Sequence, residues 1–166
     1  MGFALGLAYL VFAQPTLPLL IMGSLVALMG LAVRAYAAGC LEKDRRLALS
    51  GPYAYTRNPL YFGSLLIGIG LVLAGAQWAL GAAFVIFFLA VYGPVMRREA
   101  RNLRQRFGQE YEDYAAAVPL FFPWRKPLKP RRKTFEWKRY RANREYEAAL
   151  GYLVGVIFLI VKILLR

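Results

Sequence analysis

Residues 51–63 read GPYAYTRNPLYFG, a polar and aromatic stretch that lies between two long apolar segments. Pro52 and Pro59 fix φ and remove backbone N–H donors, so this loop has few conformations available. Arg57 places a permanent positive charge at the start of the apolar segment that follows. The tyrosines of the stretch combine apolar rings with polar hydroxyl groups. We expect such a loop to hold a charged ligand at a membrane boundary.

The composition indicates a single membrane domain that covers residues 1–166. Apolar residues make up 59% of the chain, and the mean hydropathy of +0.42 is high for a soluble protein. The formal charge of +13 would suit nucleic acid or a membrane surface, and the apolar runs favour the membrane and argue against nucleic acid.

Two residue counts restrict the chemistry. The chain has no histidine, which excludes Ser-His-Asp and Cys-His catalysis and argues against a zinc or haem site, so no metal is predicted. Cys40 is the single cysteine, so no intrachain disulfide can form.

The apolar segments predict an all-α, polytopic membrane protein with about five transmembrane helices, a cytoplasmic amphipathic helix and a Pro-rich strap. A helix over residues 1–13 would reach only about 20 Å, which is less than a ~30 Å bilayer core. We interpret it as a retained helix, because no basic region precedes it as in a signal peptide. The other expected spans are residues 17–39, 60–74, 79–96 and 148–165.

Other segments are predicted to lie at the membrane surface. Residues 97–114 carry apolar side chains at three- and four-residue spacing with charges between them, which predicts an amphipathic helix that Gly108 breaks or loosens. Residues 119–133 hold four prolines and six lysines or arginines and predict an extended strap. Residues 135–166 are expected to form one long helix. In the second span, Arg34 and Tyr36 are expected to extend to the interface.

The loops predict an orientation. The turns at residues 14–16 and 75–78 are uncharged, whereas residues 40–58 and 97–147 carry nearly all lysines and arginines. The positive-inside rule therefore places the basic side in the cytoplasm, and five crossings would place the N-terminus inside and Arg166 outside.

The loop resembles the GPY-x-x-x-RHP-x-Y-x-G signature of membrane methyltransferases, which include isoprenylcysteine carboxyl methyltransferases and phospholipid N-methyltransferases. Further pieces agree in order, and the set covers roughly residues 20–123. They are Gly68-Ile69-Gly70, then Arg98-Glu99 with Leu103, Phe107-Gly108, Tyr111 and Tyr114, and finally residues 118–123. We take residues 17–123 as the family-like core and 124–166 as a basic linker with a C-terminal transmembrane helix. Two positions depart from the pattern, where Asn58 replaces the usual His and Ala100 replaces a second Glu.

The resemblance implies S-adenosylmethionine as methyl donor and a lipid or lipid-like acceptor, either a carboxyl or an amine, at the cytoplasmic leaflet. Arg57 could pair with the donor's carboxylate or with an anionic acceptor, and Glu99 could accept hydrogen bonds from the ribose or the ammonium group. Donor and acceptor are expected to meet at the predicted catalytic residues Arg57, Asn58 and Tyr61. The predicted cofactor contacts are Tyr53, Arg57, Asn58, Pro59, Tyr61, Gly68, Gly70, Glu99, Tyr111 and Tyr114.

Each of these residues also has an ordinary structural interpretation. Arg57 could anchor a helix to lipid phosphate, Glu99 could offset its neighbouring arginines, and Asn58 could shape the turn before proline. The tyrosines could form an interfacial belt, and the glycines could serve helix packing. Two other functions stay open, an NADPH-dependent membrane reductase and a non-catalytic protein that retains the fold. The acceptor, O- versus N-methylation, the oligomeric state and the role of the last helix also stay open.

Overall fold

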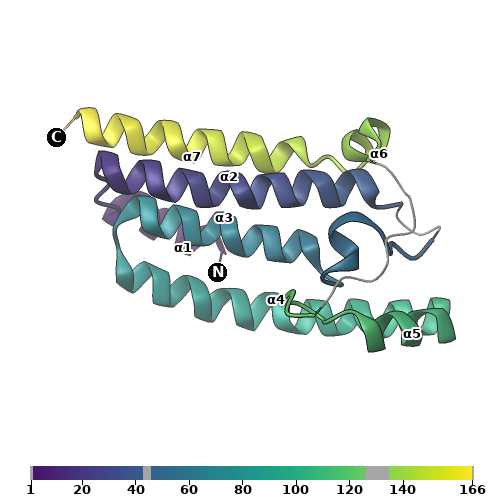
Figure 1. Ribbon diagram of the computed structural model, residues 1–166. Coiled ribbons are helices and arrows are strands. Elements are labelled where there is room, and N and C mark those ends of the chain that lie inside the picture. Colours follow the sequence, from purple (N-terminus) through teal and green to yellow (C-terminus); the bar gives the residue numbers. More distant parts are fainter. Residues whose placement is uncertain (1, 43–45, 126–134, 166) are drawn as a thin grey trace.

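The computed structural model describes residues 2–42, 46–125 and 135–165, and within these residues every regular element is helical. Figure 1 shows α7, α2, α3 and α4 side by side along one long axis, with α1 behind α3. This arrangement confirms the predicted all-α class. The bounds are α1 Gly2–Phe12, α2 Leu17–Cys40, the 3₁₀ helix η1 Gly51–Ala54, α3 Pro59–Gly75, α4 Trp78–Phe107, α5 Gln109–Ala117, α6 Trp137–Ala142 and α7 Tyr146–Leu164.

The centre of the molecule is the contact between α2 and α3, where small residues let two backbones meet. A side chain added at Gly23 would collide with the carbonyl oxygen of Gly70, and one added at Gly70 would collide with that of Gly23. Nearer the signature loop, a Cβ on Gly30 would lie 2.6 Å from the carbonyl oxygen of Gly63. Small residues at such positions permit the close approach that stabilises helix pairs in lipid.

The segment from α4 to α5 reverses direction at Gly108. The helix α4 continues past Pro94 to Phe107, so the predicted fourth span and the first part of the amphipathic helix form one continuous element. Gly108 has φ +52°, a conformation that favours glycine, and it confirms the predicted break. The helix α5 then packs on the end of α4, where Tyr111, Tyr114 and Val118 form a buried cluster with Ala100, Leu103 and Phe107.

The C-terminal part differs from the prediction of one long helix. It contains two helices, α6 and α7, because residues 143–145 leave the helical path and Arg144 has φ +55°. The helix α7 then packs against α2 and α3. Of the predicted strap, residues 126–133 lie outside the described residues.

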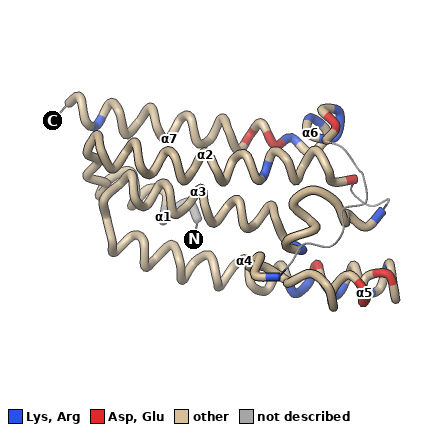
Figure 2. The backbone as a smooth tube through the Cα atoms, in the orientation of Figure 1, with Lys and Arg blue, Asp and Glu red and all other residues tan. Residues whose placement is uncertain are grey.

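Three of the described helices are long and apolar enough to cross a membrane, namely α2, α4 and α7. The helix α3 is apolar but has only 17 residues, and α1 has 11. The prediction of about five crossings therefore stays a prediction. Figure 2 shows that the charged residues gather at one end of the bundle, the end that holds the signature loop, α5 and α6. Among the described lysines and arginines, Lys162 is attached elsewhere, because its ammonium group contacts the carbonyl oxygens of Leu10 and Val11.

Candidate functional site

The signature loop is fastened to the segment that follows α5. The backbone N–H of Arg57 donates to the carbonyl oxygen of Pro119 at 3.0 Å. The Asn58 side-chain amide donates to the carbonyl oxygen of Leu120 at 2.9 Å, and the Asn58 backbone N–H donates to Thr56 Oγ1 at 3.2 Å. Pro59 then occupies the first turn of α3, where a missing N–H costs nothing. Two motif pieces more than sixty positions apart thus form one rigid unit.

Arg57 belongs to this unit and keeps a buried donor that has no partner. Its Nη1 donates to the hydroxyl oxygen of Tyr111 at 3.0 Å, and its guanidinium carbon lies 5.8 Å from the centre of that ring. Its Nε atom is buried and has no hydrogen-bond partner within the described part of the chain. A buried donor without a partner costs about 1–3 kcal/mol, so this position favours an acceptor from a ligand.

Tyr61 and Glu99 are brought together from α3 and α4. The Tyr61 hydroxyl donates to Glu99 Oε1 at 2.8 Å, and the Glu99 side chain is exposed. The Glu99 carboxylate is thus a water-accessible acceptor in contact with Tyr61, which comes three positions after Asn58 in the sequence. The simple alternative, in which Glu99 only offsets adjacent arginines, does not account for its bond to a signature tyrosine.

An aromatic cluster that the sequence analysis did not identify lies next to Tyr61, between α3 and α4. The Tyr61 and Tyr92 ring centres lie 5.1 Å apart, and those of Phe88 and Tyr92 lie 4.7 Å apart. Phe121 lies between α3 and α4, with its ring centre 5.9 Å from Phe62 and 5.8 Å from Phe88. The four-residue spacing of Phe84, Phe88 and Tyr92 on one helix face was the available signal. The cluster gives the site an apolar wall.

Several predicted site residues are structural supports. Tyr53 is buried against Ala37 and Cys40 of α2, and its carbonyl oxygen accepts a hydrogen bond from the Tyr114 hydroxyl at 2.8 Å. Burial raises the pKa of Tyr53, and it also raises the pKa of Tyr114 although the nearby Arg57 charge opposes this. Both hydroxyls therefore stay protonated near neutral pH and do not act as bases.

Packing also accounts for three other positions. A side chain at Gly68 would collide with the Phe84 ring. A side chain at Gly70 would collide with the backbone of α2. A cofactor could reach Gly68 only if Phe84 moved. Ala100, where the resemblance expects a second Glu, packs against the buried tyrosines of α5 rather than beside Glu99.

A model of the phospholipid methyltransferase family matches residues 9–110, which is more than half of the chain. This chain belongs to the phospholipid methyltransferase family. The match contains the signature loop, α3 and Glu99, and it ends just before Tyr111, so α5, α6 and α7 lie largely or wholly outside it.

Curated relatives are similar to parts of this family member. It is 38% identical over 82 residues, or 49% of the chain, to the cobalt-zinc-cadmium resistance protein CzcN of Cupriavidus metallidurans. It is 33% identical over 107 residues, or 63% of the chain, to the nickel-cobalt-cadmium resistance protein NccN of Alcaligenes xylosoxydans xylosoxydans. It is 28% identical over 83 residues, or 50% of the chain, to protein-S-isoprenylcysteine O-methyltransferase B of Arabidopsis thaliana. The matches cover 38%, 50% and 42% of these relatives, and no solved structure gives a significant match.

The described residues contain no group of three or more Cys, His, Asp or Glu side chains that could hold a metal ion. Within this site, the Arg57 guanidinium has a buried N–H without a partner and the Glu99 carboxylate is exposed, so each can form a further hydrogen bond with a small ligand.

Proposed function

We propose that the protein transfers a methyl group from S-adenosylmethionine to a lipid or lipid-like acceptor, at the end of the bundle that holds the signature loop. The single observation that carries this proposal is the buried Arg57 Nε donor without a partner, in the same signature loop that supplies Tyr61 to the Tyr61–Glu99 pair. Membership in the phospholipid methyltransferase family supports the same reaction class.

The available groups fit the polar parts of S-adenosylmethionine. Arg57 offers a charged donor to the methionine carboxylate, and such charge-assisted bonds are among the strongest in proteins. Glu99 offers a carboxylate to the ribose hydroxyls or the ammonium group. When bound, S-adenosylmethionine supplies an electrophilic methyl group. The residues of the chain bind, orient and exclude water, which are the main requirements of an in-line displacement.

The acceptor chemistry is constrained by which residues can take a proton. A carboxylate acceptor needs no deprotonation before it attacks. An ammonium acceptor must first lose a proton, and Glu99 is the carboxylate that the site offers. Asn58 cannot act as a base, and its side-chain amide already donates to Leu120. Asn58 therefore serves the site by fixing the loop.

The lipid acceptor would enter sideways from the leaflet. Each methylene that leaves the bilayer costs about 0.8 kcal/mol, so a lipid is held in the membrane while the donor arrives from water. The aromatic cluster between α3 and α4 is the apolar wall beside Tyr61. We therefore place the lateral opening between α3 and α4. From the sequence we expect this opening between the third or fourth span and the final helix, but that position is less suitable because α7 packs on α2 and α3.

The positive-inside rule assigns the charged end to the cytoplasm, so the proposed site faces the cytoplasmic leaflet. The placement of tryptophans supports a membrane-crossing orientation. Trp78 is exposed at the uncharged turn before α4. Trp124 and Trp137 are exposed in the basic segment of residues 97–147. Such residues favour the two interfaces of a bilayer.

Ligand-dependent stabilisation in nanodiscs tests this proposal against its alternatives. A ligand that binds only the folded state raises apparent stability. S-adenosylhomocysteine should raise the unfolding temperature of the wild type, and NADPH should not. Stabilisation by NADPH alone would replace the proposal with a reductase, and stabilisation by neither would favour a non-catalytic protein.

A further inference from the structure

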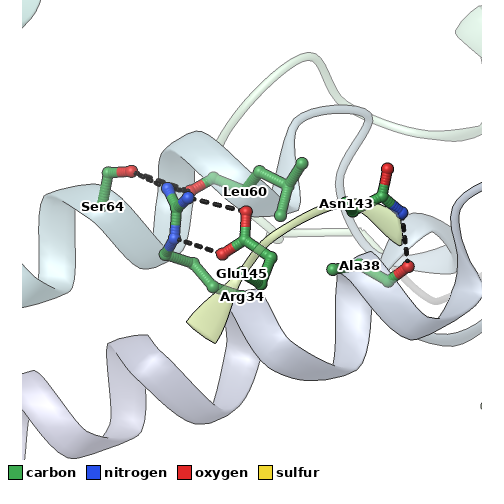
Figure 3. Close-up of polar contacts among 6 residues, drawn as sticks. All are labelled: Arg34, Ala38, Leu60, Ser64, Asn143 and Glu145. Atoms are coloured by element: carbon green, nitrogen blue, oxygen red, sulfur yellow. Dashed lines mark hydrogen bonds and ion pairs between the residues drawn. The ribbon is translucent and has the colours of Figure 1, made fainter. Parts of the chain in front are cut away.

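Arg34 is a charged residue inside an apolar helix, and its partners come from two distant parts of the chain. Its Nε and Nη2 atoms donate to the two carboxylate oxygens of Glu145 at 2.9 and 2.8 Å. Its Nη1 donates to the carbonyl oxygen of Leu60 at 3.2 Å and to Ser64 Oγ. Figure 3 shows Arg34 between the first turn of α3 and the segment that leads into α7. The prediction that Arg34 extends to the interface stays a prediction, and its guanidinium is held by Glu145, Leu60 and Ser64.

The signature itself makes room for this arginine. A Cβ on Gly63 would lie 2.5 Å from Arg34 Cγ. Any larger residue at position 63 would push the aliphatic part of Arg34 away from α3. The glycine of the signature thus has a specific purpose in this chain, because it lets the guanidinium reach Leu60 and Ser64.

The residues on either side of Arg144 attach the C-terminal segment to the core. The Asn143 side-chain amide donates to the carbonyl oxygens of Ala38 and Leu41, at 2.9 and 3.2 Å, where α2 ends. Arg144 adopts φ +55°, which turns the chain so that Glu145 faces Arg34. The Glu145 side chain is only 9% exposed and that of Arg34 is 20% exposed. A charge pair withdrawn from water in this way is costly unless its hydrogen bonds are satisfied, and here both carboxylate oxygens accept from Arg34.

We propose that the C-terminal helices brace the signature loop, with Glu145 and Arg34 as positioning residues for the proposed site. Glu145 holds Arg34 in one orientation, and Arg34 fixes Leu60 at the start of α3. Leu60 directly precedes Tyr61, whose hydroxyl orients Glu99. The brace gives a role to α6 and α7, which lie outside the family match. The part of this inference that concerns ligand binding rests on the proposed function.

The opposite end of α7 provides a matched control. The Lys162 ammonium group donates to the carbonyl oxygens of Leu10 and Val11 at 2.9 and 2.8 Å. This contact also fastens α7 to the core, but it joins α7 to α1 and involves no residue of the signature loop. Glu145→Gln and Lys162→Met therefore each remove one polar attachment of the same helix, and only the first one touches the brace.

The test measures hydrogen exchange and ligand binding on the full chain in nanodiscs. Glu145→Gln should speed amide exchange in residues 58–66 and weaken S-adenosylhomocysteine binding by at least about fivefold, the lower range of site coupling. Arg34→Lys should act in the same way, since one ammonium group cannot replace the bidentate contact. Lys162→Met should leave both quantities at the wild-type value, even if it lowers the unfolding temperature.

The outcomes separate the brace from the proposed function. Wild-type exchange and affinity in Glu145→Gln would overturn the brace, and so would equal changes in Glu145→Gln and Lys162→Met, since these would report only general stability. If the wild type binds no S-adenosylhomocysteine while Glu145→Gln alone speeds exchange in residues 58–66, the brace stands and the proposed function fails.

Discussion

The two faces of α3 make different kinds of contact with their neighbouring helices. On the side of α2, glycines and alanines bring two backbones into contact, as Gly23 and Gly70 show. On the side of α4, aromatic rings fill the space, as Phe84 does beside Gly68 and Tyr92 does beside Tyr61. Backbones cannot move out of each other's way, whereas rings can rotate or shift. We infer that the contact of α3 with α2 is fixed and holds the signature loop in place. The contact of α3 with α4 is adjustable and can admit a substrate.

The largest expected effect is on the fixed contact. Gly70→Leu should lower the free energy of unfolding by at least about 3 kcal/mol, because the new side chain would have to separate α2 from α3. Gly151→Ala is the control, since nothing lies within 4 Å of that position, and it should be neutral or stabilising by up to about 1 kcal/mol. Reversible unfolding in mixed micelles measures both.

Gly68→Ala sharpens the comparison of the two faces. The new methyl group would collide with the Phe84 side chain, which can move, whereas the methyl group of Gly70→Ala would collide with backbone. Gly68→Ala should therefore lower the free energy of unfolding clearly less than Gly70→Ala does. Equal costs for the two alanine variants would show that the α4 side is as rigid as the α2 side, and the proposed lateral opening would then lose its basis.

Arg57 should give the largest effect on ligand binding. Arg57→Gln removes the charged donor and should weaken S-adenosylhomocysteine binding by about 100-fold, or ~3 kcal/mol. Arg141→Gln on α6 is the control, because Arg141 is exposed and lies outside the loop. Calorimetry on both variants checks this, and an unchanged affinity for Arg57→Gln would remove Arg57 from the site.

Glu99 should matter more than a nearby glutamate of equal charge. Glu99→Ala should weaken S-adenosylhomocysteine binding by about tenfold, ~1.5 kcal/mol, because one charge-assisted contact is lost. Glu112→Ala should leave the affinity unchanged, since Glu112 pairs with Arg104 on the outer surface. If calorimetry gives the same affinity for both variants, the assignment of Glu99 is wrong.

The smallest effect concerns the support beneath the loop. Tyr114→Phe should lower the free energy of unfolding by about 1 kcal/mol, because the Tyr53 carbonyl loses its donor. Since burial raises the folded-state pKa of Tyr114 above its unfolded value near 10, the stability from the neutral hydroxyl is complete below about pH 10 and declines above it. The phenylalanine variant should show a weaker alkaline decline in unfolding titrations, and an identical decline would contradict this assignment.

Much of the fold could be predicted from the sequence because hydropathy and helix breakers act locally. The bounds of α2 and α3 and the break at Gly108 followed from apolar length, Pro59 and glycine chemistry. The division of the last helix did not, since residues 143–145 adopt their path through contacts with Ala38 and Arg34, which are more than a hundred positions away.

The site was predictable only in part, because a local pattern does not show contacts between distant parts of the chain. The motif order placed Arg57, Tyr61 and Glu99 in one region, and the structure joins Tyr61 to Glu99. It could not show that Tyr53 points into α2 or that Ala100 lies under α5, because one residue gives no sign of which helix will cover it. The ion pair of Arg34 was not predictable, because its partner Glu145 is more than a hundred positions away and lies beyond any local pattern.

The central claim is that the signature loop and Glu99 bind the methyl donor. Ultraviolet cross-linking of S-adenosylmethionine labelled in its methyl group, followed by peptide mapping of the full chain in nanodiscs, tests this directly. The account predicts adducts within residues 51–63 or 97–114, which excess S-adenosylhomocysteine suppresses and which Arg57→Gln strongly reduces. Adducts confined to α6 or α7, or no adduct that S-adenosylhomocysteine suppresses, would contradict it.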